Sequence, residues 1–89
     1  MATVTLRAPL RDRVDGQGRL DVEGATVGEV LRSLERSYPR IAGWILDDQG
    51  KIRRHVNVFV NGERAKEGAP LAPSDVVQVL PSISGGSAT

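Results

Sequence analysis

The chain has 89 residues, of which 39% are hydrophobic and 26% are charged, values that fit one soluble globular domain without room for a second core. A formal net charge of +1 with one Trp, one Tyr and one Phe argues against nucleic-acid binding, which needs a basic stripe and stacking aromatic rings. Cysteine is absent, which excludes disulfides and thiolate chemistry, and we find no membrane-length apolar stretch or secretory signal, so we expect a cytoplasmic protein.

The first predicted elements are two strands joined by a fairly long connection. Residues 3–7 and residues 19–23 both alternate polar and apolar side chains, which is the period of a strand with one buried face. Pro9 ends the first run, and residues 15–18 (Asp-Gly-Gln-Gly) are typical of a turn. The two runs therefore predict a hairpin.

The clearest helix follows this hairpin. Thr26 and Glu29 have the spacing of a capping box, in which each side chain accepts a hydrogen bond from a free backbone N–H at the helix start. Apolar residues then recur at helical spacing and predict one buried face: Val27, Val30, Leu31 and Leu34. Pro39 is expected to stop the helix, because the residue before a proline is pushed out of helical geometry.

The second half of the chain predicts mainly strands. Residues 41–46 suggest a short helical segment that packs Trp44 or Ile45 over the edge of the core. Residues 55–60 (His-Val-Asn-Val-Phe-Val) alternate and are rich in β-branched side chains, and Asn61-Gly62 is the preferred two-residue hairpin turn. Residues 63–65 begin the return arm, and residues 75–80 predict the final strand.

This order of elements predicts an α+β domain. One helix buries its apolar stripe on one face of a mixed sheet of about four to five strands. The most compact arrangement places the first and last strands side by side at the centre of the sheet, which is the β-grasp, or ubiquitin-like, fold. We expect this domain to span residues 1–81 and residues 82–89 to form a flexible tail.

The expected tail contains two consecutive glycines, Gly85 and Gly86. Without a Cβ on either residue, a tail can thread a narrow channel. If extended, residues 81–86 span about 20 Å, which is enough to reach well into another protein. The alternative interpretation is a frayed polar terminus, where Gly and Ser are common.

Taken together, these segments resemble the ubiquitin-like sulfur carriers of the ThiS/MoaD family, which includes the thiamine-biosynthesis carrier and the small subunit of molybdopterin synthase. The resemblance covers residues 3–86. It rests on residues 56–62, on residues 71–81 and above all on the two glycines. Within the family, residues 54–61 and the segment around Trp44 are most similar to the carrier dedicated to cysteine biosynthesis.

The resemblance implies a protein cosubstrate that is not itself an enzyme and binds no cofactor. An ATP-dependent, E1-like activating enzyme would adenylate the carboxylate of Gly86, and a sulfur source would displace AMP to leave a thiocarboxylate. A sulfur-accepting enzyme would then make cysteine or another sulfur-containing metabolite. Because Ser87, Ala88 and Thr89 follow, the resemblance implies that a zinc peptidase of the JAB1/MPN type first cleaves between Gly86 and Ser87. The alternative is a non-functional tail.

A docking surface for these partner enzymes is expected near the last strand. The period of two places Phe59 on the sheet face opposite the helix, near Leu80 and Ile83, while Pro81 opens the tail. Arg54 is expected to face an acidic partner surface. Ordinary edge packing of Phe59 and a solvated charged face are the alternatives.

Other functions stay open. A protein modifier would form an isopeptide bond with lysines through the same Gly86 carboxylate, and a ubiquitin-like binding module would use its sheet face alone. His55 has no partner Ser, Cys or second His, so we assign it no catalytic or metal-binding role. A stand-alone enzyme is the least favoured class. We expect a monomer that binds neither nucleic acid nor membranes.

Overall fold

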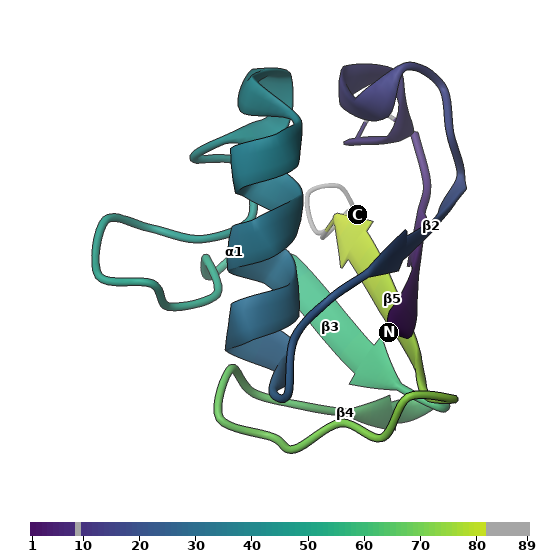
Figure 1. Ribbon diagram of the computed structural model, residues 1–89. Helices are drawn as coiled ribbons and strands as arrows, with labels where there is room; N and C mark the ends of the chain where they lie inside the picture. Colours follow the sequence, from purple (N-terminus) through teal and green to yellow (C-terminus); the bar gives the residue numbers. More distant parts are fainter. Residues whose placement is uncertain (9, 82–89) are drawn as a thin grey trace, which may run out of the picture.

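The computed structural model describes residues 1–8 and 10–81 and shows one mixed sheet with a single α-helix packed on one face (Figure 1). The elements, in chain order, are β1 (Ala2–Leu6), η1 (Leu10–Val14), β2 (Arg19–Val22), α1 (Val27–Ser37), η2 (Pro39–Ile41), β3 (Val56–Val60), β4 (Glu63–Arg64) and β5 (Val76–Pro81). Here η marks a 3₁₀-helix. Over the described residues, no helix has the length and apolar character needed to cross a membrane.

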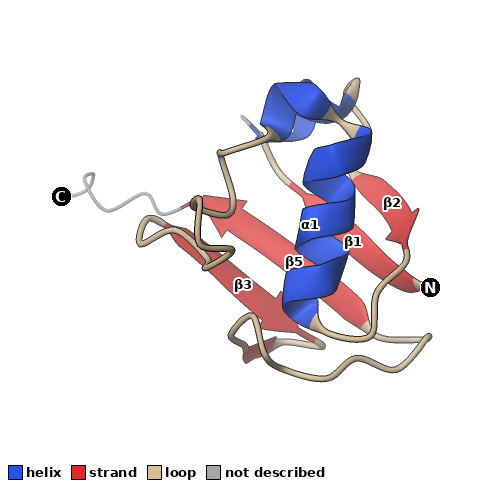
Figure 2. Cartoon of the chain, turned by 60° about the vertical axis from the view of Figure 1, so that its left-hand side comes forward, coloured by secondary structure: helices blue, strands red, loops and turns tan. Residues whose placement is uncertain are grey.

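The strands lie in the order β2-β1-β5-β3-β4. β1 and β5 are parallel, with Thr3 opposite Val76 at one end of the pair and Leu6 opposite Val79 at the other, whereas the other neighbours are antiparallel. The first and last strands therefore lie side by side within the sheet, and the predicted β-grasp arrangement is confirmed. Figure 2 shows α1 lying across one face of this sheet.

Helix α1 begins and ends where the sequence predicts. The Glu29 N–H donates to Thr26 Oγ1 at 3.2 Å, and Glu29 Oε1 accepts from the Ala25 N–H at 3.0 Å, one residue earlier than in a standard capping box. Tyr38 closes the last turn, since its N–H donates to Leu34 O at 3.0 Å. Four apolar residues of the helix are buried against the sheet: Val27, Val30, Leu31 and Leu34.

The core lies between α1 and the inner face of the sheet. Each of the three longer central strands alternates and buries valines on this face: Val4 of β1, Val56 and Val58 of β3, and Val77 and Val79 of β5. No polar or charged residue is buried within the described part of the chain. Fully burying one such aliphatic side chain contributes about 1.5–3 kcal/mol, so this layer is the main source of stability.

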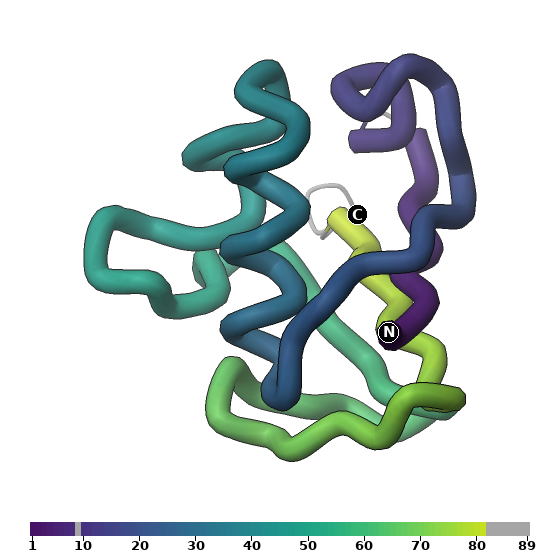
Figure 3. The backbone as a smooth tube through the Cα atoms, in the orientation of Figure 1, coloured from purple at the N-terminus to yellow at the C-terminus, as the bar shows by residue number. Residues whose placement is uncertain are grey.

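Two short helical turns close one end of the core. In η1, Leu10 and Val14 are buried, whereas the sequence predicts only a long connection between β1 and β2. The backbone tube in Figure 3 shows this connection arching at the same end of the molecule as the end of α1. The connection therefore contributes to the core rather than only joining two strands.

The short helical segment expected over residues 41–46 is misplaced, because the turn spans Pro39–Ile41. Gly43 has a φ of 83° and interrupts any continuation. The segment is held instead by Glu35 of α1, whose Oε2 accepts from the backbone N–H groups of Ile45 at 3.1 Å and Leu46 at 2.9 Å. Ile45 is fully buried as a result, whereas Trp44 is 43% exposed.

The Asn61-Gly62 turn is confirmed and has a second role. Both residues have positive φ, 52° and 88°, as a type I′ turn between antiparallel strands requires. The Asn61 side chain also reaches the start of β5: its Oδ1 accepts from the Val76 N–H at 3.0 Å, and its Nδ2 donates to Asp75 Oδ1 at 2.9 Å. The turn thus connects the β3–β4 hairpin to the last strand.

Candidate functional site

Strand β5 ends at Pro81, at one end of the sheet. Pro81, the last described residue, lies opposite Val56 at the start of β3, and Val79 lies opposite Leu6 at the end of β1. In Figure 2 the tip of β5 lies at the end of the sheet away from the N-terminus. The predicted site residues Ile83, Gly85, Gly86 and Ser87 lie outside the described residues.

The face of the sheet opposite α1 carries apolar side chains along β5 and the neighbouring β3. Phe59 lies directly opposite Gln78 of β5, so its two diagonal neighbours are Val76 and Leu80. Phe59, Val76 and Leu80 are all half-buried. They form what we call the outer patch.

Phe59 lies on the face that the sequence predicts, but it is half-buried rather than freely exposed. Arg64 of β4 lies opposite Phe59 on the other side, and its Nη2 donates to Asn57 Oδ1 at 3.0 Å, so the Arg64 side chain runs along the same face. The docking role of Phe59 stays a prediction. The register places Leu80 and Pro81 at one corner of the sheet, whereas Phe59 lies opposite Gln78, three residues before Pro81.

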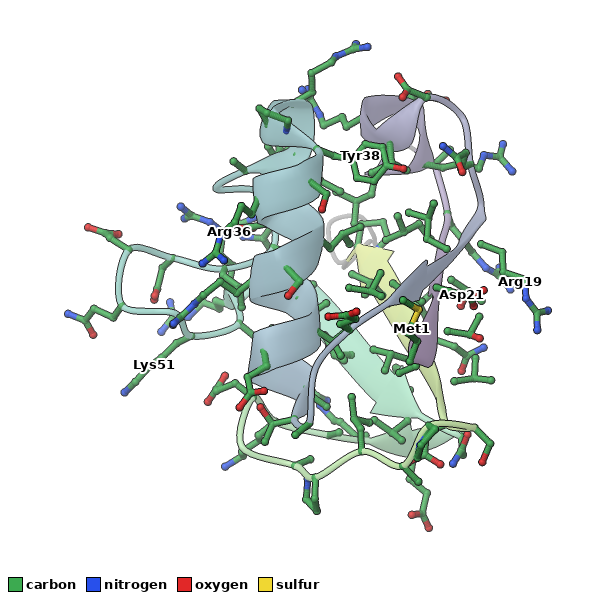
Figure 4. The ribbon with its side chains drawn as sticks, in the orientation of Figure 1. Met1, Arg19, Asp21, Arg36, Tyr38 and Lys51 are labelled. Atoms are coloured by element: carbon green, nitrogen blue, oxygen red, sulfur yellow. The ribbon has the colours of Figure 1, made fainter. Side chains whose placement is uncertain are left out.

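Basic side chains precede β3 at this same corner. Arg54 and His55 are exposed and come directly before Val56, the residue opposite Pro81. Arg53 is half-buried and donates through Nε to the Gly43 carbonyl. Lys51 is exposed and projects from the loop before β3 (Figure 4). Arg54 is thus the exposed arginine of this group, two residues before the position opposite the end of β5.

No metal-binding cluster accompanies these groups in the part of the chain that the structure describes. No set of three His, Cys, Asp or Glu side chains is arranged to hold a metal ion there. The two carboxyl groups with a lowered pKa, Asp47 and Asp75, accept hydrogen bonds from neighbouring groups of the fold. Backbone N–H groups of Lys51 and Gln49 lower the pKa of Asp47, and the Ala72 N–H and the Asn61 amide lower the pKa of Asp75.

Sequence reasoning missed one exposed contact at this end of the molecule. The Arg13 guanidinium lies 3.7 Å from the centroid of the Trp44 ring, the geometry of a cation–π interaction. Arg13 also donates to the Arg40 carbonyl at 3.3 Å. The two partners belong to η1 and to the loop after η2, and no local pattern in the sequence connects them.

A mixed sheet with parallel first and last strands, covered by one helix, defines a β-grasp protein of the ubiquitin-like class. The chain belongs to the ThiS family, whose model matches residues 4–86. The match therefore extends past the described strand β5 and ends at Gly86.

Named relatives support this assignment. The chain is 34% identical over 90 residues to the sulfur carrier protein CysO of Mycobacterium tuberculosis, covering 94% of this chain and 97% of the relative. It is 39% identical over 69 residues to small archaeal modifier protein 1 of Haloferax volcanii, covering 76% and 79%. The family thus includes proteins named as sulfur carriers and proteins named as modifiers.

A solved structure shows the same fold. A chain in the crystal structure of the Amycolatopsis orientalis BexX/CysO complex superposes with a TM-score of 0.86 at 28% identity, covering 97% of this chain and 100% of that one. In that complex a protein named CysO is bound to a partner.

Proposed function

We propose that this protein is a sulfur carrier whose working group is the carboxylate of Gly86. One observation carries the proposal: the family match ends at Gly86, the second glycine of the pair that follows β5. The 34% identity with a protein named as a sulfur carrier, over nearly the whole of both chains, supports the same conclusion.

The chemistry assigns separate tasks to this chain and to its partners. A carboxylate is a poor electrophile, so an E1-like activating enzyme first joins Gly86 to AMP and releases pyrophosphate from ATP. Sulfide, or a persulfide with a reductant, then displaces AMP and leaves the thiocarboxylate. A sulfur-accepting enzyme uses that sulfur as its nucleophile, for cysteine or another sulfur-containing metabolite. This chain supplies the carboxylate, the reach of the tail and the surfaces that bind its partners.

Processing precedes activation in this proposal. Within the sequence, Gly86 is joined by a peptide bond to Ser87 and has no free carboxylate. A zinc peptidase of the JAB1/MPN type would hydrolyse this bond and release residues 87–89. The small side chains on both sides of the bond favour access by such an enzyme.

The outer patch and Arg54 are the proposed docking surface. In the outer patch, the half-buried Phe59 ring is flanked by two aliphatic side chains, which is the composition of an interface anchor. Arg54 would favour partners with an acidic surface. Leu80 of the outer patch and Arg54 lie near the end of β5, so a partner that binds them would be held beside the point where the tail begins.

A second candidate function is protein modification. The 39% identity with small archaeal modifier protein 1 favours it, and it would use the same Gly86 carboxylate. In this case the amine of a lysine on another protein attacks the acyl-adenylate of Gly86, forms the isopeptide bond and releases AMP. A non-covalent binding module is the third possibility, and its activity would survive truncation before Gly85.

Intact-mass analysis of the protein recovered from its own cells distinguishes these functions. A sulfur carrier would be recovered as a free chain that ends at Gly86 and carries a thiocarboxylate. A modifier would be recovered joined to other proteins through a Gly86–lysine isopeptide bond. Recovery of only the unprocessed chain, with partner enzymes present, would contradict both covalent functions.

A further inference from the structure

The free edge of β3 is only partly covered by its neighbour. β4 has two residues and pairs only with Phe59 and Val60, so the first half of β3 has no strand on this side. A groove with a volume of about 290 Å³ lies there. It is lined by Val56 and Val58 of β3, by residues 52–54 and by residues 64–67.

Two backbone groups of β3 point into this groove. The Asn61 N–H donates to Val76 O, so the odd-numbered residues direct their backbone N–H and C=O groups toward β5. Because these groups point to opposite sides on alternate residues of a strand, those of Val56 and Val58 point away from β5, toward the groove. The Val56 N–H is used by Arg53 O at 3.0 Å, and Val58 O is used by the Ala65 N–H at 2.9 Å. Between described residues, no hydrogen bond uses Val56 O or the Val58 N–H.

The remaining donor and acceptor have the spacing that a parallel strand requires. In a parallel pair, one residue of the added strand donates to the carbonyl of residue i−1 and accepts from the N–H of residue i+1. Val56 O and the Val58 N–H flank Asn57 in this way. One residue of an extended peptide can therefore satisfy both groups.

The charged side chains around the groove are mainly cationic. Four lining residues are cationic: Arg53, Arg54, Arg64 and Lys66. The only acidic lining residue is Glu67, and its Oε2 already accepts from the Ile52 N–H at 2.9 Å. Arg54 and Lys66 are exposed.

We propose that this groove is a docking site for an extended acidic segment of a partner protein, which adds to β3 as a parallel strand. Residues 82–89 of the chain itself contain no acidic side chain and do not match the charge of the groove. The inference concerns the edge of β3 away from β5 and does not depend on sulfur transfer. Strand addition of this kind takes its affinity from main-chain hydrogen bonds and its selectivity from side chains.

A peptide titration of the ¹⁵N-labelled full chain tests the proposal. The probe is an acetylated, amidated hexapeptide of alternating glutamate and valine, and the matched control has lysine in place of glutamate. We expect the acidic peptide to shift the amide signals of Val56, Val58 and Ala65 and to slow hydrogen exchange at Val58. Backbone N-methylation of the peptide, which removes its donors, should abolish the effect.

Charge reversal provides the second arm of this experiment. Combining Arg54→Glu with Lys66→Glu should weaken binding by about tenfold. Arg19→Glu, an exposed residue of β2 at the opposite edge of the sheet (Figure 4), should change it by less than about twofold. Equal binding of the lysine peptide, shifts centred elsewhere, no shift at millimolar peptide, or signals that depend only on protein concentration would each overturn the proposal.

Discussion

Phe59 and Leu80 are diagonal neighbours on two adjacent antiparallel strands, on the face of the sheet that α1 leaves uncovered. Leu80 is one residue from Pro81, where the described chain ends. The apolar outer patch is thus connected to the start of the tail by a single residue. A partner that binds this patch is held beside the segment that leads to Gly86.

Phe59→Asp is therefore expected to weaken binding to the activating enzyme by more than ~1 kcal/mol, because it places a charge at the centre of an apolar contact. Calorimetric titration of the trimmed chain with the activating enzyme measures this loss. Thr5→Asp, a half-buried position on the same face two strands away from Phe59, is the matched control. Unchanged affinity, at a parental melting temperature, would mean that Phe59 only packs against its neighbours.

Gly86→Ala, introduced into a chain that ends at residue 86, should impair adenylation while leaving the melting temperature at the parental value. The residue follows the last strand, so its replacement does not touch the core, but it adds a Cβ inside the narrow channel of the activating enzyme. ATP–pyrophosphate exchange measures adenylation. An exchange rate equal to that of the parent would show that the channel does not require glycine at this position.

The free energy of unfolding should decrease at acid pH, partly because Asp47 and Asp75 become protonated. Hydrogen bonds from backbone N–H groups, and for Asp75 also from Asn61, lower the pKa of each carboxyl below its ordinary value. A lowered folded-state pKa contributes stability above the unfolded-state value, and this contribution is lost as the pH falls through the folded-state pKa. Urea unfolding should therefore show stability decreasing below about pH 4.

Asp75→Asn should reduce this acid dependence, because asparagine does not titrate. Asp48→Asn is the control, since the Asp48 side chain is exposed. Acid unfolding curves of the two variants with the same steepness would refute a contribution from Asp75.

Glu35→Ala should lower the free energy of unfolding by about 1–3 kcal/mol, because it leaves the part-buried N–H groups of Ile45 and Leu46 without their acceptor. Arg36→Ala, an exposed neighbour on the same helix, should cost much less. Chemical denaturation of both variants measures the difference. Equal losses would indicate that Glu35 acts only through the intrinsic stability of the helix.

The sequence predicts most of the fold because its strongest patterns are local. The capping box, the helical spacing from Val27 to Leu34 and the alternation of residues 56–60 each depend on neighbours within a few positions. The parallel pairing of β1 with β5 follows from compactness and is confirmed by the register.

The remaining features depend on contacts between distant residues. The five residues of η1 are too few to show a helical period, and Glu35 holds residues 45 and 46 only after the chain has folded back on α1. The contact between Arg13 and Trp44 and the groove beside β3 have the same origin. The groove exists because the chain leaves the β3 edge after Ala65, and no residue type at that position predicts this departure.

The intact mass of the chain after activation tests the central claim most directly. The full-length chain and a version that ends at Gly86 are each incubated with the activating enzyme, ATP and sulfide, and both are then weighed. We predict that only the shortened chain gains the mass of one oxygen-to-sulfur exchange. Thiolation of the full-length chain with Ser87, Ala88 and Thr89 still attached, or no thiolation of the shortened chain by an active enzyme, would contradict the claim that Gly86 is the working residue.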